Sequence, residues 1–374
     1  MRILFDGDIY SRTVFGGMVR YCNQLIDGLI ARGVDVDLLV HDGLRLPNGG
    51  GLPPCRLVRS IPQSRRYDIF HGSYYSDFTA VPPNTRTVVT VHDMIDELLA
   101  ENLIRHASSS QCTAAKSNAV ALADHVIAIS RTTRQDLQRV LGVEDRRISV
   151  VYHGVAPEFA ICGQVEGRRL VEGELDLIQP FILHVGGREG YKNFGFLMEA
   201  YAMSGAKGRA KLVAVGSQTF LLPHERALAE AHGLQSDIIL TGYVSDRLLS
   251  GLYACGSVLM MPTLYEGFGY PLVEAMACGA VVACSTAPAL VELGQGVPLV
   301  FDPHDVAGAA RVIDRAFSEN HSQRKEQARR IASGFSIQSM IDGHLNAYQT
   351  VLAQATPPPL QRLTVAYDKP DVAR

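Results

Sequence analysis

Strand-like and helix-like segments alternate along the whole chain, and the alternation starts twice. In the first half, short apolar runs are separated by helical patterns such as residues 18–31. These runs are residues 3–5, 34–40, 69–70, 87–91 and 126–129. Strands that alternate with helices are typical of a parallel sheet with crossover helices. The first half therefore predicts a doubly wound α/β domain.

The same pattern restarts after residue 180. Its apolar runs are residues 181–185, 211–215, 238–240, 258–261, 281–284 and 299–301. A chain of 374 residues is longer than one core usually organises, so a second domain is expected. We predict the α/β fold class, with two doubly wound Rossmann-like domains facing a cleft. Ligands of open α/β sheets bind outside the carboxyl ends of the strands, which places the candidate residues on facing loops.

The domain boundaries are predicted from breaks in this pattern. Residues 156–180 mix Pro, Gly and charge without clear periodicity, and Thr356 and three prolines follow the last helical pattern. We expect an N-terminal domain over 1–165 and a C-terminal domain over 166–340. A helix over 341–356 is expected to pack back toward the N-terminal domain, followed by a poorly ordered tail over 357–374.

Composition excludes several classes of protein. The net charge of −3 gives no attraction for nucleic acid, and no apolar run approaches the roughly 18 residues of a spanning helix. The first residues lack the pattern of a secretory signal, and the seven cysteines include no C-x-x-C pair. We expect a cytoplasmic protein without a disulfide framework or a zinc site.

One surface stretch leaves membrane contact open. It is rich in glycine and then in arginine, and it comprises residues 49–54 with Arg56, Arg59, Arg65 and Arg66. A mobile loop is one interpretation. The other is a basic surface for acidic head groups or a phosphate-bearing acceptor, which would put the protein at the inner face of the membrane.

Two carboxylates flank a glycine-bearing turn and a helix start. Glu266 precedes the turn of Gly267, Phe268 and Gly269, and Glu274 lies about one turn inside the helix that begins near Pro271. The turn can offer backbone N–H groups beside a positive helix end, and an ionised carboxylate can accept from two vicinal hydroxyls. This pattern predicts a nucleotide-sugar site. Acidic residues are also favoured near helix starts for electrostatic reasons alone.

Seven segments together resemble the retaining GT-B glycosyltransferases of family 4, also called glycosyl transferases group 1. The segments are FGGMVRYCNQL (15–25), TVVTVHDM (87–94), VIAISRTTRQDL (126–137), VVYHGV (150–155), ILHVGGREGYKNF (182–194), ILTGYVSD (239–246) and the E-x7-E segment (266–274). They occur in the order found in that family and cover nearly the whole chain. Such enzymes transfer a sugar from a nucleotide-diphosphate donor to an acceptor hydroxyl.

The resemblance implies roles for the donor-side residues. Lys192 matches the lysine that neutralises the diphosphate as the glycosidic bond breaks, and Arg188 is a second basic candidate in the same loop. Glu266 matches the residue that meets the donor sugar, with Gly267, Phe268 and Gly269 beside it. Glu274 matches the ligand of the ribose diol, and Val244 is expected beside the nucleobase.

The resemblance also implies roles in the N-terminal half. His92 is expected against the donor sugar, where its backbone carbonyl supports developing positive charge, and Asp93 is expected to orient the loop or the histidine. Gly16 and Gly17 are expected to approach the diphosphate at a helix start. Ser130 and Arg131 match a position near the cleft floor. The implied front-face mechanism uses a donor phosphate oxygen to deprotonate the acceptor, so no catalytic base is named.

Two features depart from the family pattern. The chain has no Trp, whereas relatives often carry one at the start of the last helix. Asp6 and Asp8 spell D-x-D, which binds a metal in a different glycosyltransferase fold. A hard cation wants several oxygen ligands, so two carboxylates make a poor site. We expect neither a metal nor a cofactor, with Lys192 and helix N-termini in place of a metal.

Three functions remain open from the sequence. The leading one is a metal-independent retaining glycosyltransferase, with GDP-mannose as the suggested donor, acting on a glycan or lipid-linked acceptor in surface-polysaccharide or lipopolysaccharide assembly. A nucleotide-sugar epimerase on a similar scaffold would need no acceptor. A non-catalytic nucleotide-sugar binding subunit would bind donor without turnover. The sequence does not fix the oligomeric state.

Overall fold

The structure is a computed structural model of the 374-residue chain. It describes residues 1–12, 16–42, 52–61, 65–73, 76, 78, 81, 84–99, 107–216 and 218–354. The predicted tail over 357–374 lies outside these residues, as do Phe15 and residues 49–51 of the glycine-rich stretch.

The described residues of the N-terminal unit form a sheet of seven parallel strands in the order β3-β2-β1-β4-β5-β6-β7. The strands are β1 (Arg2–Asp6), β2 (Asp35–Leu39), β3 (Arg56–Val58), β4 (Ile69–Ser73), β5 (Arg86–Val91), β6 (His125–Ala128) and β7 (Ile148–Val150). The helices are α1 (Ile9–Arg12), α2 (Gly17–Ala31), α3 (Ile95–Leu98), α4 (Ala107–Leu122), α5 (Arg131–Leu141) and the 3-10 turn η1 (Asp145–Arg147). Because side chains alternate along a strand, Ile3 and Phe5 pack with α2 and Leu4 packs on the opposite face.

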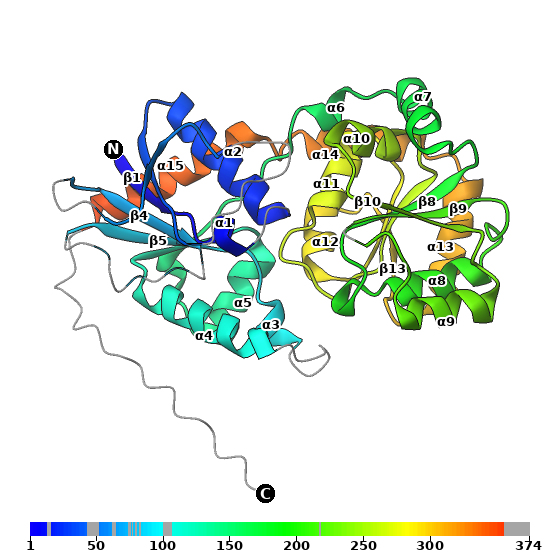
Figure 1. Ribbon diagram of the computed structural model, residues 1–374, viewed down its shortest axis with the longest axis horizontal. Coiled ribbons are helices and arrows are strands. Elements are labelled where there is room, and N and C mark those ends of the chain that lie inside the picture. The colour runs from blue at the N-terminus through cyan, green and yellow to red at the C-terminus, as the bar shows by residue number, and fades with distance from the viewer. Residues whose placement is uncertain are drawn as a thin grey trace, which may run out of the picture.

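The described residues of the C-terminal unit form a sheet of six parallel strands in the order β10-β9-β8-β11-β12-β13. The strands are β8 (Phe181–Val185), β9 (Lys211–Val215), β10 (Ile238–Gly242), β11 (Val258–Met261), β12 (Val282–Ser285) and β13 (Leu299–Phe301). The helices are α6 (Glu158–Ile161), α7 (Gln164–Leu175), η2 (Gly190–Lys192), α8 (Phe194–Met203), α9 (Pro223–His232), α10 (Asp246–Cys255), α11 (Tyr270–Ala277), α12 (Pro288–Gly294), α13 (Val306–Ser318) and α14 (Ser322–Ala332). The two units lie side by side, so the predicted pair of α/β domains is confirmed (Figure 1).

The chain crosses between the units twice, and both predicted boundaries need correction. Helices α6 and α7 already pack against α10, so the first crossing precedes α6, and position 165 falls inside α7. The last helix, α15 (Ile337–Ala353), packs against α2 of the N-terminal unit, and position 340 falls inside it (Figure 1). A continuous helix belongs to the core that it packs on, whereas the sequence pattern showed only where periodicity weakened.

Strands β3 and β7 were absent from the predicted set. Each is three residues long, with the sequences Arg-Leu-Val and Ile-Ser-Val. Runs this short carry no alternation that could be recognised, and sheet pairing rather than local propensity forms them. They lie at the two edges of the sheet, so the topology of the strands between them is unaffected.

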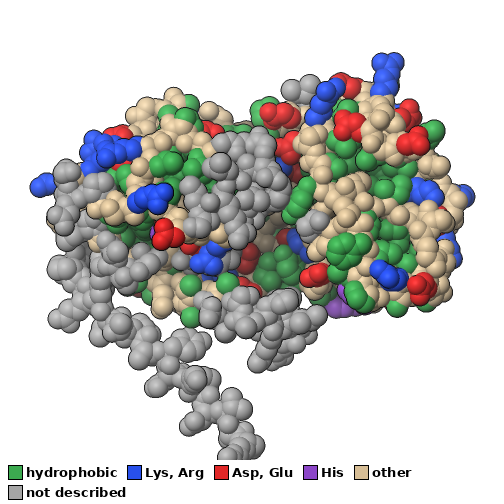
Figure 2. All heavy atoms as spheres, in the orientation of Figure 1, with side chains coloured by type: hydrophobic (Ala, Val, Ile, Leu, Met, Phe, Trp, Pro, Cys, Tyr) green, Lys and Arg blue, Asp and Glu red, His purple; other side chains and the backbone are tan. Residues whose placement is uncertain are grey.

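Among the residues that the structure describes, no helix is both long enough and apolar enough to cross a bilayer. On the face shown in Figure 2, acidic and basic side chains are interspersed rather than gathered into a patch of one sign. This mixed surface agrees with the small net charge of −3.

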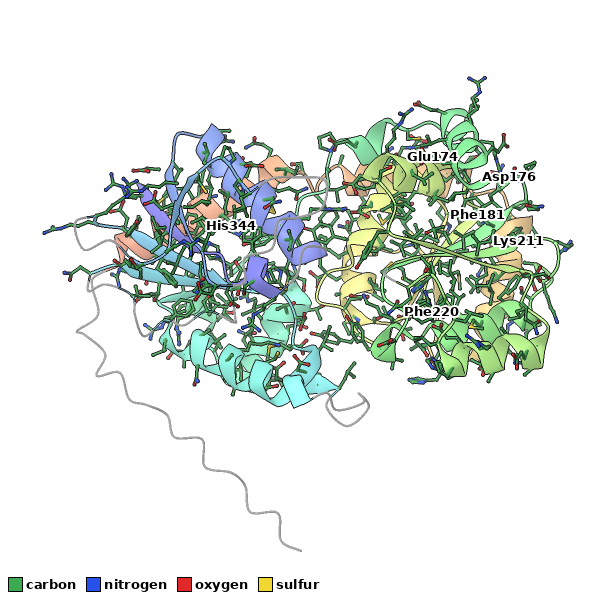
Figure 3. All side chains as sticks on the ribbon, in the orientation of Figure 1. Glu174, Asp176, Phe181, Lys211, Phe220 and His344 are labelled. Atoms are coloured by element: carbon green, nitrogen blue, oxygen red, sulfur yellow. The ribbon has the colours of Figure 1, made fainter. Side chains whose placement is uncertain are left out.

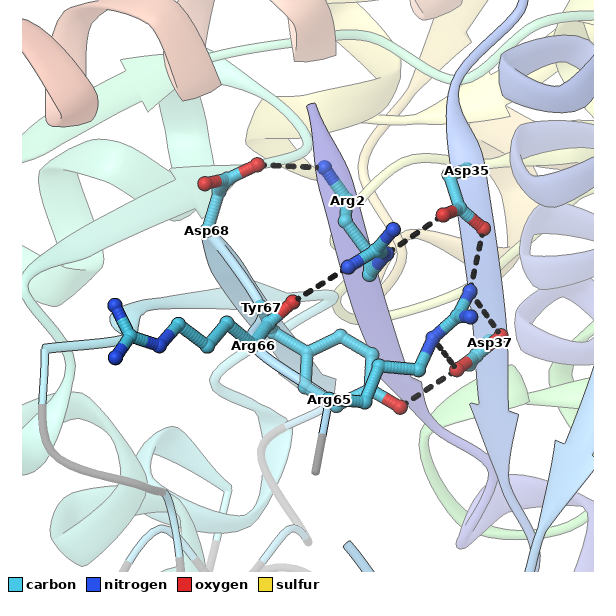
Figure 4. Close-up of polar contacts among 7 residues, drawn as sticks. All are labelled: Arg2, Asp35, Asp37, Arg65, Arg66, Tyr67 and Asp68. Atoms are coloured by element: carbon cyan, nitrogen blue, oxygen red, sulfur yellow. Dashed lines mark hydrogen bonds and ion pairs between the residues drawn. The ribbon is translucent and has the colours of Figure 1, made fainter. Parts of the chain in front are cut away.

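The arginine-rich stretch after β3 is partly neutralised. Arg65 Nη2 donates to Asp35 Oδ1 at 2.7 Å and to Asp37 Oδ1 at 3.2 Å (Figure 4). Arg2 Nε donates to Asp35 Oδ2 at 2.6 Å, and the Tyr67 hydroxyl donates to Asp37 Oδ2 at 2.6 Å. These contacts tie the segment before β4 to β1 and β2. Arg65 is therefore engaged within the fold, whereas Arg56, Arg59 and Arg66 are exposed.

Candidate active site

The start of helix α2 lies against the start of helix α11. Gly16 caps α2 with a φ of +111°, a conformation that glycine adopts without strain. A Cβ added to Gly17 would lie 3.0 Å from Cδ2 of Tyr270, the first residue of α11. Two helix N-termini from different units therefore meet at this interface. Each carries unpaired backbone N–H groups and a partial positive charge, which favours an anion nearby.

Lys192 and Glu266 form an ion pair within the C-terminal unit. Lys192 ends the turn η2, and Glu266 lies in the loop between β11 and α11. The Lys192 Nζ donates to Glu266 Oε1 at 2.7 Å and lies 5.0 Å from the ring centroid of Tyr191. Burial acts to lower the pKa of Lys192, but Glu266 and Tyr191 outweigh it and raise that pKa. The lysine is therefore a permanent cation beside a carboxylate.

The turn after Glu266 touches the N-terminal unit. A Cβ added to Gly267 would lie 1.8 Å from the backbone carbonyl oxygen of His92. The Thr133 hydroxyl donates to the Gly267 carbonyl at 3.3 Å. Only glycine fits where the backbones approach so closely. The predicted sugar-binding turn therefore packs directly against the backbone of His92.

Glu274 is buried in α11, and both of its oxygens accept hydrogen bonds. The Arg20 Nη1 of α2 donates to Oε1, and the Tyr253 hydroxyl of α10 donates to Oε2 at 3.0 Å. Burial raises the pKa of Glu274, while Arg20 and Tyr253 act to lower it. The structure thus brings Glu274 to the interface, but a protein cation from the other unit already contacts it.

Arg188 is buried and has partners of its own. Its guanidinium forms an ion pair with Glu225, with Nε 3.0 Å from Oε1. It also donates to the carbonyls of Gln218 and Phe220, at 2.9 and 2.6 Å. Only 2% of its surface is exposed. These contacts make Arg188 a support of the loop after β9, and its role at a diphosphate stays a prediction.

The other predicted donor-side residues lie on loops of the C-terminal unit. Val244 follows β10 and packs partly buried against the core near α10 and α11. Phe268 is 3% exposed, and its ring lies 5.0 Å from that of His153. Gly269 caps α11 with a φ of +106°. Phe268 therefore packs with its side chain in the interface, which leaves only its backbone for a ligand.

His92 belongs to a cluster of buried aromatic rings. Its ring stacks on that of His153 at 5.3 Å, and His153 stacks on Tyr270 at 4.9 Å with an interplanar angle of 6°. Burial lowers the pKa of His92 to about 3, with His344 and Lys116 acting in the same direction. The His92 side chain is therefore neutral at pH 7 and can offer a hydrogen bond without adding charge.

A chain of hydrogen bonds connects α2 to β5, the strand that directly precedes His92. Its members, from the hydroxyl end to the carbonyl end, are Tyr348, His71, Thr90, Tyr21, His344 and Met340. The Met340 carbonyl only accepts, so His344 Nδ1 donates to it and Nε2 accepts from the Tyr21 hydroxyl. The remaining directions follow in turn. The Thr90 hydroxyl donates to Tyr21, His71 Nε2 donates to Thr90, and the Tyr348 hydroxyl donates to His71 Nδ1. Figure 3 shows His344 inside the N-terminal unit, where this chain fixes α2 and α15 against β4 and β5.

Ser130 and Arg131 act in the fold at the interface. The Ser130 side chain caps α5 by accepting from Thr133 N at 3.0 Å. Glu292 of α12 accepts from the backbone N–H groups of Arg131 and Thr132, both at 2.8 Å. The carboxylate thus sits on the N-terminus of α5 and joins the two units. Both residues lie near the interface, and their described contacts are with protein.

The D-x-D carboxylates are committed to basic neighbours. Asp6 Oδ1 pairs with His41 Nε2, and Asp8 Oδ2 pairs with Arg12 Nε. In the part of the chain that the structure describes, no group of three or more His, Cys, Asp or Glu side chains is arranged to hold a metal. In this structure both carboxylates are therefore engaged by protein groups.

Three residues at the interface were not among the predicted site residues. Arg20, His153 and Tyr270 all lie in segments that carry the family resemblance, but no pattern of spacing singles them out. His153 Nδ1 and the Tyr270 hydroxyl are buried without a hydrogen-bond partner. Their positions depend on packing between the units, which only the structure shows.

Two family models match this chain, one in each unit. The model of "Glycosyltransferase Family 4" matches residues 15–159, and that of "Glycosyl transferases group 1" matches residues 179–319. The chain belongs to the family 4 glycosyltransferases. The two matches cover the N-terminal and C-terminal units in turn, and this glycosyltransferase carries its candidate residues within both matched ranges.

Similar proteins include two mannosyltransferases of Escherichia coli. The "Serotype-specific mannosyltransferase WbdA" is 28% identical over 284 residues, which cover 74% of this chain and 35% of that protein. The glycosyltransferase thus spans about a third of WbdA. The "O-antigen chain mannosyltransferase B" is 26% identical over 306 residues, covering 80% of this chain and 78% of that protein.

A solved structure shows the fold of the glycosyltransferase. The sucrose-phosphate synthase of Thermosynechococcus elongatus superposes with a TM-score of 0.76 at 19% identity, covering 94% of this chain and 99% of that chain. A match of this extent includes most of both units. The predicted GT-B fold is therefore confirmed.

Proposed function

We propose that this glycosyltransferase moves mannose from a nucleotide-diphosphate donor to an acceptor hydroxyl and retains the anomeric configuration. The observation that carries the proposal is the pair of Lys192 and Glu266, whose Nζ and Oε1 atoms lie 2.7 Å apart. A cation for a leaving diphosphate and an acceptor for sugar hydroxyls are adjacent, as the reaction requires. Both lie beside the interface at which Gly267 meets His92.

In this proposal Lys192 stabilises the leaving group. Negative charge grows on the diphosphate as the glycosidic bond breaks, so a fixed cation interacts more strongly with the transition state than with the ground state. The N-terminus of α2 at Gly16 and Gly17 adds partial positive charge from the opposite unit. Glu266 accepts from sugar hydroxyls, and Glu274 accepts from the ribose diol.

His92 positions the donor sugar. Its neutral ring can hydrogen-bond a sugar hydroxyl, and its carbonyl, which lies against Gly267, can face the positive charge that develops on the anomeric carbon. Retention then follows from attack on the face that the leaving diphosphate occupies, with a phosphate oxygen taking the acceptor proton. No protein nucleophile is part of this proposal.

We propose further that the reaction needs no metal. Lys192 and two helix N-termini supply positive charge, while Asp6 and Asp8 are paired with His41 and Arg12. The names of the two Escherichia coli relatives support mannose as the sugar and O-antigen assembly as the setting. GDP-mannose as the donor, a glycan or lipid-linked acceptor, a cytoplasmic location and peripheral membrane contact stay predictions.

The experiment combines binding and turnover. Purified protein is titrated with GDP-mannose and with UDP-, dTDP- and ADP-sugars in the presence of a chelator, and release of the nucleoside diphosphate is then followed with and without oligosaccharide acceptors. The proposal expects selective binding of one donor, acceptor-dependent turnover and, by NMR, a product with the anomeric configuration of the donor. An inverted product would overturn retention.

A nucleotide-sugar epimerase is the alternative that this experiment separates. It would convert the donor to its epimer with no acceptor present. A binding subunit would take up donor and give no product in either case.

A further inference from the structure

Arg20 reaches from the N-terminal unit into the C-terminal unit. It lies one turn inside α2, where its backbone N–H donates to the Gly16 carbonyl at 3.2 Å. Its Nη1 donates to Glu274 Oε1 and its Nη2 donates to Asp246 Oδ1 at 2.8 Å. The guanidinium therefore joins α2 to the starts of α10 and α11.

Aromatic rings hold this guanidinium in place. The Arg20 Cζ atom lies 5.7 Å from the ring centroid of Phe159 and 5.9 Å from that of Tyr270. A guanidinium near aromatic faces gains electrostatic attraction in addition to its hydrogen bonds. Arg20 is thus positioned by four groups of the C-terminal unit: two carboxylates and two aromatic rings.

The two carboxylates differ in exposure. The side chain of Glu274 is 3% exposed, and its second oxygen accepts from the Tyr253 hydroxyl. The side chain of Asp246 is 51% exposed, and that of Arg20 is 29% exposed. A buried carboxylate needs a donor, whereas Asp246 can be satisfied by water. Arg20 can therefore leave Glu274 only when another donor replaces it.

We propose that Arg20 occupies the ribose position of the donor site when no donor is bound, and that the donor displaces it. This inference rests on the proposed function, in which Glu274 accepts from the ribose diol. Two vicinal hydroxyls supply the hydrogen bonds that Glu274 loses, and Arg20 turns toward Asp246 and solvent. Arg20 is then a specificity-determining residue, because a ligand without a ribose diol cannot satisfy the carboxylate that it vacates.

The proposal predicts that removal of Arg20 increases the affinity for the donor, which other roles for Arg20 do not predict. A residue that competes with the donor lowers its affinity, so removing that residue tightens donor binding. A residue that binds the donor directly gives the opposite change. A residue with a purely structural role changes the melting temperature and leaves the relative affinities of different nucleotides unaltered.

The test compares two variants with a matched control. Arg20→Gln removes the competing cation, and Asp246→Asn removes its exposed partner without touching Glu274. Arg32→Gln is the control, because Arg32 also lies at an end of α2 and pairs with an acidic residue, Asp342 of α15, at 2.9 Å. Circular dichroism establishes that each variant is folded.

Calorimetric titration is carried out with GDP and with its 2′,3′-dideoxy analogue. Loss of a hydrogen bond to a charged group is worth about 1.5 kcal/mol or more, so Arg20→Gln is expected to bind GDP about tenfold more tightly than the wild type. Asp246→Asn is expected to bind GDP more weakly than the wild type, because the displaced Arg20 then lacks the carboxylate toward which it turns. The gain of Arg20→Gln should not appear with the dideoxy analogue, and Arg32→Gln should match the wild type with both ligands.

Equal or weaker binding of GDP by Arg20→Gln would overturn the inference, as would an equal gain with the dideoxy analogue. If UDP or ADP proves to be the nucleotide of the donor, the same comparison is made with that nucleotide and its dideoxy form. Failure of the wild type to bind any of these nucleotides would instead count against the proposed function. The two failures are thus distinguishable.

Discussion

Individual residues at the interface are paired with one another where the proposed reaction needs them to meet a donor. Lys192 pairs with Glu266, and Glu274 pairs with Arg20. Each pair joins a cation with a carboxylate that accepts from hydroxyls in the proposal. A donor that brings a diphosphate and several hydroxyls can replace both sets of partners. The chemistry of the site therefore depends on few side chains, and each can be tested singly.

Lys192→Ala is expected to abolish most turnover while leaving the fold intact. Removal of a group that stabilises developing charge costs about 100-fold to 1000-fold in kcat. Initial rates at saturating donor measure this effect. Lys211→Ala is the control, because Lys211 is also paired with an acidic residue, Asp237, but lies at the start of β9 away from the interface (Figure 3). A Lys192→Ala rate near that of the wild type would contradict the role of this lysine.

Glu274→Gln is expected to raise the KM for the donor more than it lowers kcat. The amide keeps the shape of the side chain but presents a donor where the ribose diol needs an acceptor, and a neutral acceptor forms the weaker bond. Steady-state kinetics separate the two constants. Glu319→Gln is the control, because Glu319 pairs with Arg315 on an exposed helix end. Unchanged KM in Glu274→Gln would remove the ribose assignment.

At the scale of elements, the sequence predicted the described strands of both sheets except β3 and β7. These two are the edge strands of the N-terminal sheet. It also predicted the turn at residues 267–269, because glycine and proline mark turns and helix starts locally. It could not predict that Arg188 is buried against Glu225, or that Arg20 and His153 lie at the interface. Those contacts join segments far apart in the chain, and their partners have no local signature.

The turn after Glu266 is the element that depends most on close approach. Gly267→Ala is expected to separate the turn from His92, since its Cβ would lie 1.8 Å from the His92 carbonyl oxygen. Turnover should fall at least tenfold, because the sugar-binding groups of the two units no longer align. Gly173→Ala, inside α7 with open space around it, is the control and should gain about 0.5–1 kcal/mol of stability. Full turnover in Gly267→Ala would show that the contact is dispensable.

At the scale of the whole molecule, buried neutral histidines make the fold sensitive to acid. Burial lowers the pKa of six histidines among the described residues, to about 3 for His92, to about 4 for His125, His184 and His344, and well below 6.5 for His71 and His153. Four of them, His71, His92, His153 and His344, lie in the aromatic and hydrogen-bonded cluster beneath the interface.

The melting temperature is expected to fall steeply as the pH drops from 7.5 to 5. In the unfolded chain these histidines take up protons near pH 6.5, whereas in the fold they stay neutral. The unfolded state then binds more protons, so stability is full above pH 6.5 and is lost as the pH falls toward the lowered pKa values. Each histidine contributes roughly 1.4 kcal/mol per pH unit in this range. Six of them can offset much of a typical stability of about 5–15 kcal/mol.

Four carboxyls oppose this trend. Partial or full loss of hydration raises the pKa of Asp27, Asp96, Glu97 and Glu274, so protonation of these groups favours the fold as the pH falls. Their effect is concentrated at lower pH, since their ordinary values lie near 4. Thermal denaturation at half-unit steps of pH measures the balance, and a melting temperature that is flat between pH 7.5 and 5 would contradict the histidine account.

The central claim is that Lys192, Glu266 and Glu274 form a metal-free donor site. The most direct test is calorimetric titration of the wild-type protein with GDP-, UDP-, dTDP- and ADP-sugars in the presence of EDTA. The account predicts saturable binding of one donor at one site per chain, unchanged when EDTA is replaced by Mg²⁺ or Mn²⁺. Binding of no donor, or binding only after a divalent metal is restored, would contradict it.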